Sequence, residues 1–297
     1  MKSIVLQGSL VALVTPFKKD KVDLAGLKEN IVFQLQNKTA GFVPCGTTGE
    51  APTLSESEWE AVIETTVKTV NKQKLVIAGA GTNSTKKTIT LTKKAKELGT
   101  DAVLIVSPYY NKPTPEGLYR HFRSINDSVN IPIVVYNIPS RTGVNILPKT
   151  FERFKKNCPN IIAVKEAAGS LDQVSEIIAR CGEKISVLSG DDSLTLPILS
   201  VGGKGVISVI ANIVPKDLAT MIEYYTEGKV ELAAKLNQKL LSLAKAMFIE
   251  TNPIPIKTAM NLMGMAAGDL RLPLCEPSPE SLAVIKRALT DYGIKIK

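Results

Sequence analysis

The apolar run Ile161-Ile162-Ala163-Val164, directly followed by Lys165, shows the pattern that decides the fold. Its hydrophobic side chains follow one another without alternating with polar ones. Continuous hydrophobicity over so short a run is typical of a strand that is buried on both faces, as the strands of parallel sheets are. The run therefore predicts a parallel strand over Ile161–Lys165.

Seven further short runs share this character, being rich in Val, Ile and Ala and bounded by Gly, Pro, Ser or Thr. Helical patterns separate them, and the clearest begins at Ser55, where Glu58 completes a capping box. Strands and helices that alternate in this way predict an α/β fold, the (β/α)8 TIM barrel. The other predicted strands are Ser9–Thr15, Gly41–Cys45, Leu75–Ala78, Ala102–Val106, Ile133–Tyr136, Ile185–Leu188 and Gly205–Ser208.

An open, doubly wound sheet is the alternative arrangement of the same elements. Its dinucleotide-binding fingerprint requires G-x-G-x-x-G after the first strand. The nearest candidate, Gly79-Ala80-Gly81, follows the third predicted strand and has Ser84 in place of the last glycine. The sequence therefore favours the closed barrel, and we expect no nucleotide cofactor.

The chain continues well beyond the eighth predicted strand. Residues 209–297 are more than one closing helix needs, and helical patterns recur at Val230–Phe248, Pro255–Met263 and Pro279–Tyr292. We therefore expect a catalytic barrel domain over residues 1–228. A C-terminal helical extension over residues 229–297 is expected to pack on the barrel.

The composition of the 297 residues argues against several classes of function. One histidine and four scattered cysteines lack the spacing of a metal site, so no metal is expected. The net charge of +9 comes mainly from lysines spread along the chain, a pattern typical of a solvated surface rather than a nucleic-acid interface. Without a membrane-spanning run or a signal-peptide pattern, we expect a cytoplasmic protein with neither membrane nor nucleic-acid partners.

Reactive groups of such barrels lie at the C-terminal ends of the strands. Lys165 is the only lysine that directly ends a predicted strand. Apolar neighbours of its stem would disfavour the ammonium form, lower the pKa of the amine and leave a nucleophile for a carbonyl carbon. The alternative is a lysine that extends to the rim or holds a carboxylate by charge alone.

Hydroxyl groups and one cation follow other predicted strands. Thr47, Tyr110 and Tyr136 could relay the protons of carbinolamine formation and dehydration without a histidine. Arg141 offers a guanidinium fork for a substrate carboxylate. The glycines around Thr47 and Thr48 let backbone N–H groups approach a second carboxylate. Together these residues predict a pocket for a small keto acid or dicarboxylic acid.

Five motifs resemble those of the dihydrodipicolinate synthase (4-hydroxy-tetrahydrodipicolinate synthase) family, within the superfamily of pyruvate-dependent class I aldolases and lyases. The resemblance extends from about Gly8 to the C-terminal helices. It implies a Schiff-base condensation of pyruvate with L-aspartate 4-semialdehyde to 4-hydroxy-tetrahydrodipicolinate, the first committed step of the diaminopimelate/lysine pathway. The motifs are G-T-T-G-E at 46–50, S-P-Y-Y-N-K-P at 107–113, Y-N-I-P-S-R-T-G at 136–143, V-K-E-A at 164–167 and S-G-D-D at 189–192.

The resemblance also implies catalytic roles for individual residues. Lys165 would form the Schiff base with pyruvate. The proton relay would consist of Thr47, Tyr136 and Tyr110. Of these, Tyr110 would reach into the site of a neighbouring subunit, since members of the family are usually homotetramers built from tight dimers.

Substrate-binding roles follow from the same resemblance. Arg141 would bind the carboxylate of aspartate semialdehyde. The pyruvate pocket would be lined by Thr48, Gly190 and Ile207. No cofactor is implied, and the partners would be the two substrates and further copies of the chain.

Two alternatives for the function remain open. N-acetylneuraminate lyase and the 2-keto-3-deoxy-sugar-acid aldolases, of the same superfamily, share the lysine and the tyrosine. The Thr47-Thr48 pair and Arg141 favour the synthase, because a compact charged aldehyde needs a cationic partner whereas a polyol sugar needs neutral hydroxyls. A barrel that binds a keto acid without converting it is the alternative from another class.

The same resemblance bears on regulation by lysine. Lysine-regulated bacterial members bind lysine through a tyrosine, an asparagine, a carboxylate and histidines. Tyr109 and Asn83 match that pattern, but Lys87 stands at the position of the carboxylate, and Glu56 and Trp59 stand at those of the histidines. Because an ammonium at residue 87 repels the ammonium of lysine, we expect weak inhibition or none.

Overall fold

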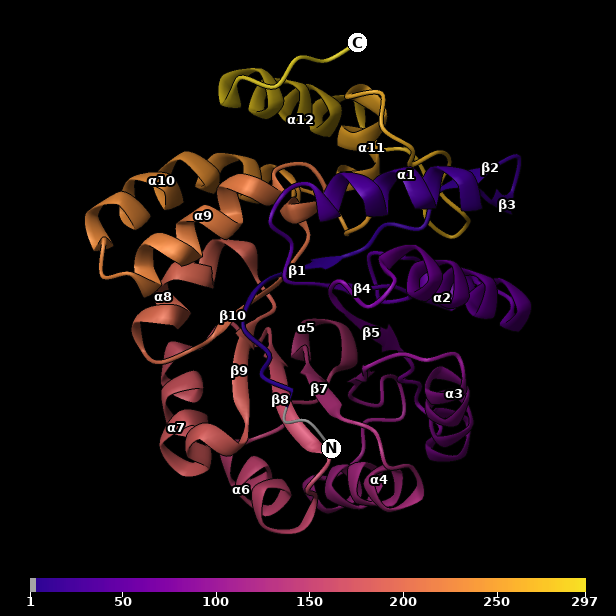
Figure 1. Ribbon diagram of the computed structural model, residues 1–297, viewed down its shortest axis with the longest axis vertical. Helices are drawn as coiled ribbons and strands as arrows, with labels where there is room; N and C mark the ends of the chain where they lie inside the picture. The colour runs from indigo at the N-terminus through magenta and orange to yellow at the C-terminus, as the bar shows by residue number, and fades with distance from the viewer. Residues whose placement is uncertain (1–3) are drawn as a thin grey trace. The chain divides into compact units, whose positions relative to one another are not determined.

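Eight parallel strands form a closed barrel, as the sequence predicts, in the computed structural model, which describes residues 4–297 (Figure 1). Around the barrel the strands follow the order β1, β10, β9, β8, β7, β6, β5 and β4. Their bounds are β1 Gly8–Ala12, β4 Gly41–Val43, β5 Leu75–Gly79, β6 Ala102–Val106, β7 Ile133–Asn137, β8 Ile161–Glu166, β9 Ser186–Ser189 and β10 Gly205–Ser208.

The strands differ from the predicted ones mainly where they end. β1 ends at Ala12 rather than Thr15. β4 ends at Val43 because Cys45 adopts the left-handed conformation, with φ 55°, which a strand does not accommodate. An antiparallel hairpin of β2 (Phe17–Lys18) and β3 (Lys21–Val22) was not predicted, since its turn lacks an Asn-Gly or Asp-Gly pair.

Helices alternate with the barrel strands and continue after the last one. The predicted helix Pro279–Tyr292 is confirmed as α12, and α4 covers Pro115–Ser128. The remaining α-helices are α1 Leu24–Leu35, α2 Glu56–Val70, α3 Thr85–Glu97, α5 Pro139–Thr142, α6 Pro148–Asn157, α7 Leu171–Cys181, α8 Thr195–Ser200, α9 Pro215–Thr226, α10 Val230–Ala246 and α11 Ile254–Leu262.

The capping box at the start of α2 is confirmed. The Ser55 hydroxyl accepts a hydrogen bond from the Glu58 N–H at 3.2 Å, and the Glu58 carboxylate accepts one from the Ser55 N–H at 3.0 Å. Both bonds satisfy donors that the first turn of a helix otherwise leaves without partners. The capping box therefore explains why α2 starts after Ser55, as the sequence predicts.

The chain divides into two compact units, which we describe separately. The first comprises the residues up to Gly8 together with Ile77–Ile207, and the second comprises Ser9–Val76 together with Ser208–Lys297. The predicted domain boundary between residues 228 and 229 lies inside the last of these segments and stays a prediction.

In the first unit, β6, β7, β8 and β9 pair in parallel, and aromatic side chains fill the space under α4 and α6. The ring of Phe154 lies 5.4 Å from that of Phe122 and 5.7 Å from that of Phe151, measured between centroids, and all three are fully buried. Edge-to-face contacts of this kind add to the stabilisation from burial. They hold the helices against the strands that carry the candidate site.

In the second unit, α10 packs against α9 and α12, and α11 also packs against α12 (Figure 1). Leu243 of α10, Met260 of α11 and Leu289 of α12 are buried where these helices meet. Among residues 4–297, no helix has both the length and the apolar character needed to cross a bilayer.

Candidate active site

Lys165 lies near the end of β8 and is buried, with 5% of its surface exposed. Tyr136 faces it in register on β7. Side chains at paired positions of parallel strands point to the same side of the sheet, and Lys165 Nζ lies 4.4 Å from the centroid of the Tyr136 ring. The structure therefore brings together two of the predicted site residues.

The surroundings of Lys165 favour the free amine. Burial is the main reason that its pKa falls to about 8, and the positive charge of Arg141 lowers it further. The buried carboxylate of Asp192 opposes both effects. With a pKa of 8, about a tenth of the amine is unprotonated at pH 7. Lys165 thus has the lone pair that an attack on a carbonyl requires.

Gly190 lies against the stem of Lys165. Its N–H donates a hydrogen bond to the Glu166 carbonyl oxygen at 2.7 Å. A Cβ at residue 190 would lie 2.7 Å from the Ala167 Cβ and 3.2 Å from the Lys165 Cγ, so a larger residue would collide with Ala167 and crowd the stem of Lys165. Ile207, on β10, is buried in the same unit.

Arg141 lies on α5, the short helix that follows β7. Its side chain is exposed, yet its charge acts on the pKa of Lys165. The helix ends at Thr142 and is capped by Gly143, whose φ of 71° is left-handed and suits glycine. The cation is therefore presented to solvent at the end of the strand that carries Tyr136.

Tyr110 follows β6 and is 90% exposed. Its φ of 73° places a bulky residue in the left-handed region, which is unfavourable without glycine. In the single chain its ring is thus in solvent rather than buried as Tyr136 is.

Sequence reasoning missed a buried network next to the lysine. The carboxylate of Glu166 accepts hydrogen bonds from Asn137 Nδ2 at 3.0 Å and from Gln173 Nε2 at 3.1 Å. Burial raises the pKa of Glu166 and these bonds oppose the shift. The network fixes the ends of β7 and β8, directly after Tyr136 and Lys165. Its only signal in the sequence was that Asn137 and Glu166 each directly follow a site residue, and Gln173 gave no signal at all.

In the second unit, the predicted motif at 46–50 forms a tight turn after β4. The Gly49 N–H donates to the Gly46 carbonyl oxygen and the Glu50 N–H donates to that of Thr47, both at 3.1 Å. Thr47 is partly exposed, whereas Thr48 is buried. The turn therefore has its own backbone hydrogen bonds.

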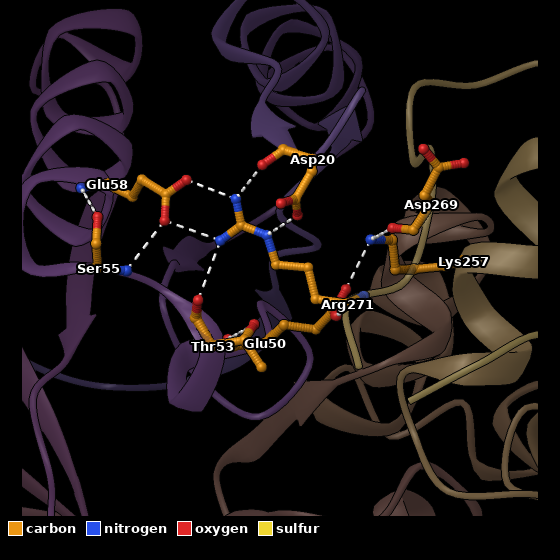
Figure 2. Close-up of polar contacts among 8 residues, drawn as sticks. All are labelled: Asp20, Glu50, Thr53, Ser55, Glu58, Lys257, Asp269 and Arg271. Atoms are coloured by element: carbon orange, nitrogen blue, oxygen red, sulfur yellow. Dashed lines mark hydrogen bonds and ion pairs between the residues drawn. The ribbon is translucent and has the colours of Figure 1, made fainter. Parts of the chain in front are cut away.

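A polar cluster that the sequence did not predict lies beside this turn in the second unit (Figure 2). The Arg271 guanidinium donates to the two carboxylate oxygens of Glu58 at 2.8 and 2.6 Å and to Asp20 Oδ1 at 3.0 Å. Hydrogen bonds from Arg271 are the main reason that the pKa of Glu58 falls to about 2. Lys257 Nζ pairs with Glu50 Oε1 at 2.6 Å.

A lysine of lowered pKa, buried at the end of a barrel strand and stacked over a tyrosine, is the arrangement of class I aldolase-like lyases. Comparison with known proteins specifies the group within that class. The chain belongs to the dihydrodipicolinate synthetase family, whose model matches residues 5–292.

Relatives and solved structures agree with this assignment. The 4-hydroxy-tetrahydrodipicolinate synthase of Methanocaldococcus jannaschii is 54% identical over 288 residues, which cover 97% of this chain and 99% of the relative. Chloride-inhibited dihydrodipicolinate synthase from Acinetobacter baumannii, complexed with pyruvate, is 41% identical with a TM-score of 0.95, covering 98% of this chain and 100% of that one. DHDPS from Cyanidioschyzon merolae with lysine bound is 38% identical with a TM-score of 0.95, covering 97% and 98%.

Proposed function

We propose that this chain condenses pyruvate with L-aspartate 4-semialdehyde through a Schiff base on Lys165, giving 4-hydroxy-tetrahydrodipicolinate. The observation that carries the proposal is the buried Lys165 with its pKa of about 8 beside the ring of Tyr136. Relatives about half identical over nearly the whole chain are named 4-hydroxy-tetrahydrodipicolinate synthase, which favours this reaction over the sugar-acid lyases and over binding alone.

The chemistry begins with the free amine. Lys165 Nζ attacks the keto carbon of pyruvate, and the resulting carbinolamine loses its oxygen as water to leave the imine. Protons must move to that oxygen and away from the nitrogen, and we assign them to Tyr136, Thr47 and a Tyr110 from a neighbouring subunit. The aldehyde enters after water has left, which predicts ping-pong kinetics.

Substrate binding completes the proposal. We assign the carboxylate of aspartate semialdehyde to Arg141, because its guanidinium is exposed on α5 and its charge acts on Lys165. The pyruvate pocket is assigned to Thr48, Gly190 and Ile207. Pyruvate bound to the relative from Acinetobacter baumannii supports pyruvate as a substrate.

Trapping with borohydride tests the covalent step. Incubation with pyruvate and sodium borohydride reduces the imine to a stable secondary amine, and peptide mass spectrometry locates it. We expect one modified peptide, containing Lys165. A chain that binds pyruvate reversibly but gains no mass would be a keto-acid-binding barrel, and the proposed reaction would be refuted.

The second substrate is tested by turnover. With pyruvate saturating, aspartate semialdehyde should be consumed, whereas N-acetylneuraminate and 2-keto-3-deoxy-sugar acids should not be cleaved. Cleavage of a sugar acid with no consumption of the semialdehyde would assign the chain to the lyases of the same superfamily. Intersecting lines in the initial-rate plots would contradict the proposed order.

A homotetramer of tight dimers and a cytoplasmic location are part of this proposal. The exposure of the Tyr110 ring supports its assignment to a neighbouring site. Tyr110→Phe should form a normal oligomer and lose activity about tenfold or more. Mixing it with Lys165→Ala should restore activity, because in a hybrid dimer one site then holds both native residues. No recovery, despite subunit exchange proven by mass spectrometry, would place the function of Tyr110 within its own chain.

A further inference from the structure

The turn at 46–50 is flanked by unfavourable backbone conformations. Cys45 precedes it with φ 55°, and Glu50 ends it with φ 52°. Left-handed conformations are unfavourable for such residues because Cβ approaches the following carbonyl oxygen. They persist only where surrounding contacts hold them, and they cluster at functional sites. The contacts of this turn therefore show which side chains keep it in its unfavourable conformation.

Glu50 is held through both oxygens of its carboxylate (Figure 2). Oε1 accepts a hydrogen bond from Lys257 Nζ at 2.6 Å, and Oε2 accepts one from the Arg271 N–H at 3.1 Å. Lys257 Nζ also donates to the Asp269 carbonyl oxygen, and the Lys257 and Glu50 side chains are each only 1% exposed. A buried ion pair stabilises little relative to apolar residues, but in some proteins it fixes a single arrangement.

Thr48 is held from the same segment. Asn252, just before α11, donates from Nδ2 to Thr48 Oγ1 at 3.0 Å, and both side chains are buried. Residues 252–257 thus contact the turn at two of its side chains. The sequence separation is 204 residues for one contact and 207 for the other, and both lie within the second unit.

We propose that Lys257 and Asn252 are positioning residues, which set the conformation of the turn at 46–50 so that its backbone N–H groups near Thr48 can bind the carboxylate of pyruvate. The inference rests on the proposed function, which assigns Thr48 to pyruvate. Neither residue is proposed to touch substrate. Both act through the turn.

The expected consequence is selective for one half of the reaction. Without the cation of Lys257, the Glu50 carboxylate is buried and unpaired, so the turn relaxes from its left-handed ends. The N–H groups then lose their preformed arrangement and pyruvate binds more weakly. Aspartate semialdehyde, assigned to Arg141 of the other unit, should be affected much less.

Steady-state kinetics can separate the two effects. In a ping-pong reaction, kcat/KM for pyruvate reports only the first half-reaction, and kcat/KM for the semialdehyde reports only the second. We expect Lys257→Met and Asn252→Ala each to lower the value for pyruvate about tenfold relative to that for the semialdehyde. Lys38→Met, which removes a half-exposed ion pair with Glu223, is the matched control and should change neither.

If Lys257 and Asn252 only stabilise the folded chain, the two kcat/KM values should change together. Loss of folded protein lowers both kcat/KM values by one factor, and an unchanged ratio in the two variants would overturn the inference. Asn252→Ala leaves the buried charges paired, so it remains informative if Lys257→Met does not fold.

The double variant Glu50→Gln with Lys257→Met removes both charges and should recover stability to urea while the ratio stays low. Recovery of the ratio together with stability would also overturn the inference.

Borohydride trapping of the wild-type chain distinguishes failure of the proposed function from failure of the positioning role. If pyruvate is not trapped at Lys165, the proposed function fails and this inference fails with it. If pyruvate is trapped and the ratio does not change, only the positioning role is wrong.

Discussion

Lys165 and Lys257 are the two lysines that are buried in the part of the chain that the structure describes, and each unit holds one of them. Burial lowers the pKa of both. At Lys257 the carboxylate of Glu50 accepts a short hydrogen bond and favours the ammonium. At Lys165 the charges of Asp192 and Arg141 act in opposite directions, and burial decides the result.

Burial alone therefore does not make a lysine a nucleophile. An ammonium with a bonded carboxylate keeps its proton and serves as a fixed charge. A buried amine without such a bond loses its proton readily and can attack a carbonyl. The partner of the lysine, rather than its depth, separates a structural group from a reactive one.

The largest expected effect comes from removing the nucleophile. Lys165→Ala should lower turnover about 10³-fold or more, because the amine assigned to the imine is removed. Borohydride trapping of pyruvate should disappear in this variant and persist at Lys165 in Lys257→Met. Peptide mass spectrometry after reduction measures both. Full trapping at another lysine of Lys165→Ala would show that Lys165 is not the nucleophile, and trapping at Lys257 would reverse the roles assigned to the two buried lysines.

The free energy of unfolding should depend more on Lys257 than on Lys165, whereas turnover depends more on Lys165. Lys257→Met leaves a carboxylate buried without its cation, and breaking such a pair costs about 3–5 kcal/mol. Lys165→Met exchanges a desolvated amine for an apolar side chain, so the free energy of unfolding should stay equal or rise. Urea unfolding measures the difference, with Lys38→Met expected within about 1 kcal/mol of the wild type. A larger loss for Lys165→Met than for Lys257→Met would contradict the comparison.

The pH dependence sharpens the contrast further. Below about pH 8 the ammonium form of Lys165 dominates and cannot attack, so kcat/KM for pyruvate should fall about tenfold per pH unit. Above that pH the free amine dominates and the value should level off. Lys257→Met should lower the whole profile without moving its midpoint. A midpoint near the ordinary lysine value of about 10.4 would mean that burial does not activate Lys165.

The smallest expected effect concerns an exposed lysine. Lys87 on α3 is in solvent, and by the family resemblance it stands where regulated members carry a carboxylate. Free lysine should therefore inhibit only weakly, with half-inhibition above about 1 mM at subsaturating pyruvate, corresponding to less than about 4 kcal/mol of binding. Lys87→Glu is the matched variant and should be the more sensitive one. Half-inhibition of the wild type below 1 mM would show that lysine binds by another arrangement.

The barrel could be predicted because its signals are local. The buried strands are built on short apolar runs, such as Ile161–Val164 in β8, and the capping box at Ser55 lies within four residues. Lys165 was found by the same means, as the lysine that ends such a run. The turn of the β2–β3 hairpin gave no such signal, because Lys19 and Asp20 adopt left-handed conformations without glycine.

The contacts around the site could not be predicted, because they join residues far apart in the chain. Glu166 and Asn137 are polar residues at strand ends, and only the pairing of β7 with β8 shows that they meet. Lys257 lies on a helix, and no feature of the sequence predicts that it pairs with Glu50. Long-range pairs of single charges leave no periodic pattern for sequence reasoning to detect.

The place of the anchoring segment in the chain has a consequence for biosynthesis. A ribosome makes the turn at 46–50 early, whereas Asn252 and Lys257 follow more than 200 residues later. Until they emerge, the Glu50 carboxylate remains without its cation and the turn is free to relax. A chain that stops before residue 252 already carries every barrel strand and Lys165, yet it lacks the groups that shape the turn. We therefore expect a chain that ends before residue 252 to bind pyruvate more weakly than the full chain does.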